Sequence, residues 1–105
     1  MGLEVYWLEL AENKLEDIFG YHLVKANKKV AEKLVHGIVD TTIGIENQPE
    51  IGQIEINLNH RKQEFRYLVF KNYKIIYWVN YKYNRIEIAN VFDTRQNPKK
   101  INETQ

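Results

Sequence analysis

The chain has 105 residues, no cysteine and a formal net charge of +1. This length fits one domain, and a chain without cysteine has no disulfide framework, zinc ribbon or thiol chemistry. The first residues lack a basic segment followed by a long apolar run, and no apolar run is long enough to span a bilayer. We therefore expect a cytoplasmic protein with no membrane partner.

The small net charge hides an uneven distribution along the chain. Residues 1–59 carry five Lys/Arg and ten Asp/Glu, whereas residues 60–85 carry seven Lys/Arg and one acid. The basic segment indicates a local surface for an anionic partner. Lysine and arginine that only solvate the outer face of a sheet would give the same pattern.

The first half of the chain predicts a strand followed by a helical hairpin. Alternating β-prone residues at Leu3–Trp7 predict a short first strand. Apolar residues then follow helical spacing over about 8–24 and again over about 28–46, with a break at KANKK. Pro49 and Gly52 predict a loop at 47–53. Residues 54–64 fit either a short strand or irregular structure.

The second half predicts an antiparallel meander. Strand-like runs occupy Phe65–Phe70, Lys74–Asn80 and Arg85–Phe92, with connectors as short as those of hairpins. The order of elements predicts an α+β fold with a short N-terminal strand, a helical hairpin on one face of the sheet and a three-stranded meander. We predict one domain over residues 1–98 and a flexible tail over 99–105.

Both faces of the predicted sheet carry large apolar side chains. Strict alternation puts Tyr77 and Trp78 on opposite faces of the middle strand, and it groups Phe92 with Ile88 but not with Val91. A second apolar face usually meets a partner. We therefore expect the isolated chain to be sticky or dimeric.

Five segments, in this order, resemble the RelE/ParE superfamily of toxins from type II toxin–antitoxin modules, which includes plasmid stabilisation proteins. They are ELAENKLEDIF, PEIG, FRYLV, YKIIYWV and RIEIANVFDTR. The resemblance covers about Val5 to Pro98 and implies the toxin fold of that superfamily. It also implies a cognate antitoxin whose C-terminal segment wraps the toxin. The other end of such an antitoxin often binds operator DNA, so this chain would meet the operator only indirectly.

The resemblance leaves three roles open. ParE-like members inhibit DNA gyrase and have no recognised nuclease site, whereas RelE-like members cleave mRNA, on the ribosome or free, without a metal. A toxin-like chain without target activity would act only as a corepressor or interaction module. We expect no cofactor, and no metal, because the three histidines lack a carboxylate pattern.

The candidate site residues come from the basic positions of the family. Metal-free RNA cleavage needs groups that move protons and that stabilise the phosphorane charge. If the chain is a nuclease, the resemblance makes Arg66, Lys74 and Arg95 the catalytic residues; each could instead be a solvated charge or a contact to an acidic antitoxin. The predicted target- or antitoxin-binding residues are Arg61, Arg66, Tyr67, Lys74, Trp78, Asp93 and Arg95.

One departure from the family weakens the nuclease role. Asp93 stands where many relatives have a histidine, and no tyrosine or histidine follows Arg95. A carboxylate repels phosphate, so we predict that Asp93 caps a turn or forms a salt bridge with Arg66 or Arg95. The missing proton-transfer groups favour the gyrase-inhibiting type or the corepressor without target activity over the nuclease.

Overall fold

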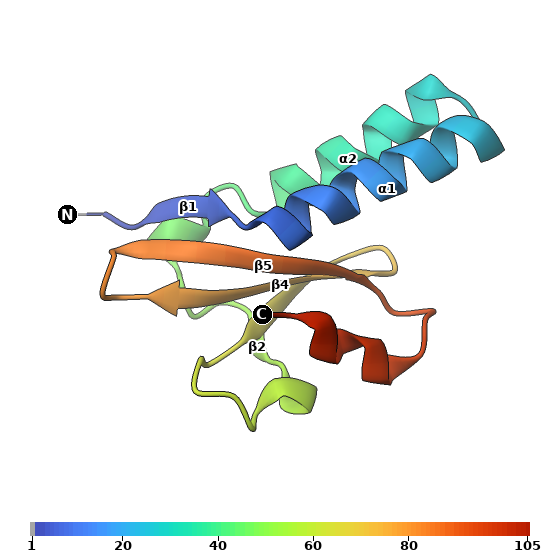
Figure 1. Cartoon of the computed structure of the whole chain (residues 1–105). Coiled ribbons are helices and arrows are strands. Elements are labelled where there is room, and N and C mark those ends of the chain that lie inside the picture. The colour runs from blue at the N-terminus through green and yellow to red at the C-terminus, as the bar shows by residue number, and fades with distance from the viewer. Residues whose placement is uncertain (1) are drawn as a thin grey trace.

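The computed structural model describes residues 2–105, which form two layers (Figure 1). A hairpin of α1 (Glu9–Lys25) and α2 (Lys28–Thr41) lies on one face of a five-stranded sheet and extends beyond its edge. The strands are β1 (Glu4–Trp7), β2 (Gln53–Ile54), β3 (Arg66–Phe70), β4 (Tyr73–Asn80) and β5 (Arg85–Asp93). Three 3-10 helices are η1 (Ile45–Asn47), η2 (Ile56–Leu58) and η3 (Pro98–Glu103).

The strand order is β1-β5-β4-β3-β2, with β1 parallel to β5 and the other pairs antiparallel. The α+β class, the helical hairpin and the meander of β3, β4 and β5 are confirmed. The structure adds the short edge strand β2, whose Gln53 lies at the end of the predicted loop and whose Ile54 lies in the segment that the sequence left open. Within residues 2–105, no helix combines the length and the apolar character that crossing a membrane requires.

The helical hairpin has a clear start for its second helix and an earlier end than predicted. The side chain of Asn27 accepts a hydrogen bond from the backbone N–H of Val30 at 2.9 Å and so caps α2. The helix ends at Thr41 rather than near residue 46. Thr42 is the C-terminal cap of α2, and Gly44, whose φ of 88° is left-handed, redirects the chain into η1.

Each face of the sheet carries its own hydrophobic core. The core under the helices includes Ala11, Ile38, Tyr73, Ile75, Tyr77, Ile86, Ile88 and Val91. The core on the opposite face consists of Leu58, Phe65, Ile76, Ala89, Phe92 and Ile101, with Trp78 partly buried against it. The second apolar face is therefore covered by the chain's own η2 and η3. The expectation that this face is open to a partner is wrong.

A β-bulge changes which side chains of β5 share a face. The register between β4 and β5 shifts so that Ile76 pairs with Asn90 and Tyr77 pairs with Ile88. Ala89 is the extra residue, and the alternation reverses at it. Val91 therefore joins the core under the helices and Phe92 joins the opposite core. The strict alternation predicted for this strand is therefore wrong beyond Ala89.

The C-terminal segment, residues 97–104, is packed against the sheet, whereas the sequence predicted a flexible tail over residues 99–105. Ile101 is 1% exposed and completes the core beneath η3. The guanidinium of Arg61 donates hydrogen bonds to the carbonyls of Asn102 and Thr104. The amide of Asn90, itself buried, donates to the hydroxyl of Thr104 at 2.9 Å. One apolar side chain and these polar contacts hold the segment on the sheet.

Candidate functional site

A groove of about 810 Å³ lies between α1 and the chain that follows β5. We call it the α1–η3 groove. Its apolar floor is made by Ile18, Tyr73 and Val91. Its walls carry both signs of charge, from Lys14, Asp17, Asp93, Arg95, Lys99, Lys100 and Glu103.

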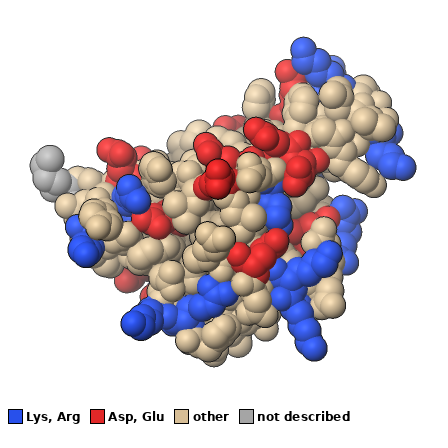
Figure 2. All heavy atoms as spheres, viewed as in Figure 1, with Lys and Arg blue, Asp and Glu red and all other residues tan. Residues whose placement is uncertain are grey.

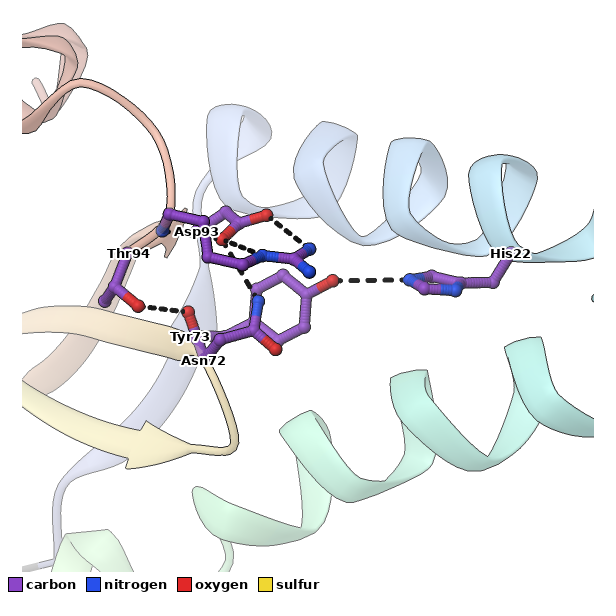
Figure 3. A network of polar contacts seen from close by, with 6 residues as sticks. His22, Asn72, Tyr73, Asp93 and Thr94 are labelled. Atoms are coloured by element: carbon purple, nitrogen blue, oxygen red, sulfur yellow. Dashed lines mark hydrogen bonds and ion pairs between the residues drawn. The ribbon is translucent and has the colours of Figure 1, made fainter. Parts of the chain in front are cut away.

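Tyr73 begins β4 at the inner end of this groove. It follows a tight turn at Lys71, whose φ is 53°, and its side chain is 4% exposed. Its hydroxyl points toward His22 of α1, with the oxygen 3.5 Å from Nε2 (Figure 3). Burial, and then the charge of Asp93, raises the pKa of Tyr73. The phenol therefore stays protonated at neutral pH and can donate a hydrogen bond.

Asp93 organises the turn that leaves β5. It accepts hydrogen bonds from the backbone N–H of Arg95 at 2.9 Å and from its guanidinium at 3.0 and 3.1 Å. The amide of Asn72 donates to it at 3.0 Å (Figure 3). The hydrogen bond from Arg95 is the largest influence that lowers the pKa of Asp93. Asp93 thus both caps the turn and forms a salt bridge, with Arg95 and not with Arg66.

We expect Asp93→Asn to lower the free energy of unfolding at pH 7 by no more than about 1 kcal/mol, because the ion pair is open to solvent. The folded-state pKa of Asp93 lies below its ordinary value of 3.8. The ionised Asp93 carboxylate therefore adds its full share to the free energy of unfolding above that value. This share is lost as the pH falls through the folded-state pKa. Urea denaturation at pH 7 and at pH 3 measures both effects. The prediction would be contradicted if Asp93→Asn lost the same unfolding free energy at pH 7 and pH 3. It would also be contradicted if Asp40→Asn, on the exposed face of α2, had an equal effect.

The predicted nuclease residues lie apart. Arg66 pairs across the sheet with Tyr77, so it lies on the helix side. Its guanidinium donates to the carbonyl of Gly52 at 2.8 Å and to the carboxylate of Glu64 at 2.9 Å. Arg66 therefore fixes the edge of the sheet at β2.

Lys74 points to the opposite face, because it pairs with Phe92 of the second core. Its Nζ lies 2.8 Å from the carboxylate of Glu55 and 4.3 Å from the ring centroid of Tyr67. Arg66, Lys74 and Arg95 thus occupy three places, and each has its own carboxylate partner.

The remaining predicted residues serve the fold in this structure. Arg61 holds the C-terminal segment, and the hydroxyl of Tyr67 donates to the side chain of Gln53 at 3.0 Å. Trp78 is partly buried in the second core. Of the residues predicted to bind a target or antitoxin, Asp93 and Arg95 line the groove.

Sequence reasoning missed two contacts in the groove, the one between Tyr73 and His22 and the ion pair between Lys14 and Glu103, whose atoms are 2.6 Å apart. Both contacts join residues far apart in the chain, so no local pattern identifies them. Among residues 2–105 no group of three or more histidine, aspartate or glutamate side chains could hold a metal ion.

The fold is shared with a solved structure titled "Chromosomal ParDE TA system from P. aeruginosa". The TM-score is 0.72 at 17% sequence identity, over 87% of this chain and 95% of that chain. The chain belongs to the family described as "ParE toxin of type II toxin-antitoxin system, parDE", whose model matches residues 5–98. The family resemblance predicted from the sequence is therefore confirmed. No curated protein matches the chain at a significant level.

Proposed function

We propose that the chain stops bacterial growth by inhibiting DNA gyrase and that a cognate antitoxin neutralises it. Membership of the ParE family supports the role of toxin. We favour gyrase over mRNA as the target because Arg66, Lys74 and Arg95 lie apart from one another. Phosphoryl chemistry needs its cations aimed at one developing charge, and these three lie on different faces and ends of the sheet.

The α1–η3 groove is the proposed contact site for the antitoxin. Its floor is apolar, whereas its walls alternate between lysine or arginine and carboxylates. Such a surface fits an amphipathic peptide segment that buries its apolar side chains and pairs its charges at the rim. Arg95, with an exposed guanidinium, is the side chain best placed to meet a carboxylate of that segment.

One observation supports mRNA cleavage as a second candidate. The Tyr73 hydroxyl and His22 form a contact that could move a proton, and both lie in the groove that Arg95 also lines. Because burial raises the pKa of Tyr73, this residue would act as the general acid rather than the base. The nuclease would then use the groove and not the three cations predicted from the sequence.

Purified chain is tested in parallel on gyrase supercoiling and on a ribosome-bound transcript. We expect loss of supercoiling, an intact transcript and recovery when the product of the adjacent antitoxin gene is added. Arg95→Glu should weaken antitoxin binding by about tenfold, because a like charge replaces an ion-pair donor. The matched change Lys62→Glu, outside the groove, should leave binding unchanged.

The outcomes separate the candidates. Transcript cleavage that disappears in Tyr73→Phe would replace gyrase inhibition by the nuclease. If the chain neither inhibits gyrase nor cleaves the transcript but still binds the antitoxin, it acts as an interaction module or corepressor. If Arg95→Glu and Lys62→Glu change antitoxin binding equally, the groove is not the antitoxin site. This result would not bear on whether the target is gyrase or mRNA.

A further inference from the structure

We propose that two copies of this chain associate through the solvent face of α1, with the two helices antiparallel and crossing at Gly20. This interaction goes beyond the toxin function and does not depend on its target. It also differs from the dimer expected from the second apolar face of the sheet, because η2 and η3 cover that face.

Charge is segregated along the helical hairpin. Its base carries four acids and one lysine, at Glu9, Glu12, Glu16, Asp17 and Lys14. From residue 18 to residue 31, around the tip, there are three lysines and no acid. Figure 2 shows acidic atoms gathered over the part of the hairpin that lies on the sheet and basic atoms toward its projecting end.

Apart from Lys14, which pairs with Glu103, most of these charges form no ion pair within residues 2–105, although Glu32 follows Lys28 by one turn of α2. Among the ion pairs found within residues 2–105, none includes Glu9, Glu12 or Glu16 of the base, or Lys28 or Lys29 of the tip. Both groups are exposed. Each is therefore available to an oppositely charged surface of another molecule.

The tip lysines oppose the electrostatics of their own helix. Lys28 and Lys29 form the first turn of α2, which contains no acid. The N-terminal end of a helix carries partial positive charge, so carboxylates stabilise it and lysines do not. Positive charge is thus kept at the tip against the local preference of the helix, which indicates that it meets something negative.

The middle of α1 presents a smooth and partly apolar surface. Gly20 is exposed, and a Cβ built on it would meet nothing within 4 Å. Helical spacing puts Glu16 and Leu23 on the same face as Gly20. Leu23 is 44% exposed and the adjacent Val24 is 83% exposed. Glycine lowers helix stability, and at this position it lets a second backbone approach closely.

A second copy of the chain would match the acidic base, the basic tip and the exposed surface around Gly20 at the same time. When two α1 helices cross antiparallel at Gly20, Glu16 lies opposite Val24 of the other copy. Glu12 lies toward the far end of the other hairpin, where α1 ends at Lys25 and α2 begins with Lys28 and Lys29. The acidic base of each copy then faces the basic tip of the other, and two-fold symmetry repeats the contact and closes the assembly. DNA or an anionic membrane could pair with the lysines of the tip but would leave the acidic base of the hairpin without a partner.

Charge reversal at each end provides the test. The tip variant is Lys28→Glu with Lys29→Glu, and the base variant is Glu12→Lys with Glu16→Lys. We expect sedimentation equilibrium of the full-length wild type to show a dimer at low salt, with a dissociation constant about tenfold higher in 0.5 M salt. Each variant alone should be monomeric. An equimolar mixture should recover a heterodimer, because the acidic tip of one variant then faces the basic base of the other.

The tip variant also controls for folding. New carboxylates in the first turn of α2 should keep or raise its melting temperature, so loss of association cannot be loss of structure. Lys62→Glu with Lys82→Glu, away from the hairpin, should leave the dimer intact. A monomeric wild type, a tip variant that still dimerises equally well, or a mixture that stays monomeric would overturn the proposal. Binding of the wild-type tip to a short DNA duplex or to anionic vesicles, without a dimer, would do the same.

Discussion

Replacing Lys74 by methionine is expected to destabilise the folded chain by about 3 kcal/mol at pH 7. The ammonium of Lys74 lies 2.8 Å from the carboxylate of Glu55, whose side chain is 2% exposed. Methionine keeps the length of the apolar stem but leaves the Glu55 carboxylate buried without its cation. The free energy of unfolding from urea titration at pH 7 measures the loss.

The double variant Glu55→Gln/Lys74→Met should recover most of this stability, because the uncompensated charge is gone. Lys62→Met, at an exposed position before β3, should change stability by less than about 0.5 kcal/mol. If Lys74→Met and Lys62→Met behave alike, the ion pair makes no net contribution to stability. A double variant as unstable as Lys74→Met would show that Lys74 acts through packing on Tyr67 instead.

Gly37→Ala is expected to destabilise the chain by about 1–3 kcal/mol, although alanine is the better helix former. Gly37 lies in α2 under the ring of Phe70 from β3. A Cβ at this position would be 2.1 Å from Cζ of that ring, so the ring must leave its place. Thermal unfolding followed by circular dichroism measures the change.

Gly20→Ala provides the matched control in the other helix. A Cβ there meets no atom within 4 Å, so the same substitution should stabilise the monomer by about 0.5–1 kcal/mol through helix propensity alone. The two substitutions therefore have opposite signs. If Gly37→Ala also stabilises the chain, Phe70 does not pack on Gly37 as the structure shows. Phe70→Leu in the Gly37→Ala background should restore part of the loss.

Much of the fold follows from local patterns. Helical spacing located both helices, and alternation located β3, β4 and β5 to within one residue at each end. These local patterns failed at positions whose conformation depends on contacts with residues distant in sequence. The extra residue at Ala89 exists only in relation to β4. Ile101 is one apolar residue in a polar tail, and its burial depends on packing with Leu58 of η2 and with apolar residues of β4 and β5.

The candidate site was harder to predict for the same reason. Family positions identified Arg66, Lys74 and Arg95, but only the pairing of strands shows that Arg66 and Lys74 point to opposite faces. Tyr73 and His22 are 51 residues apart in sequence. Their contact depends on how α1 lies over β4, which the helical and strand periods do not specify.

The pairing of β1 with β5 has a consequence for synthesis on the ribosome. The first strand finds its only sheet neighbour in the last one, through Glu4 opposite Arg85 and Trp7 opposite Ile88. A nascent chain therefore cannot close its sheet until β5 has left the exit tunnel, and contacts this distant in sequence form late. The α1–η3 groove needs residues from α1 and from η3. The groove therefore cannot form until η3 has also left the tunnel.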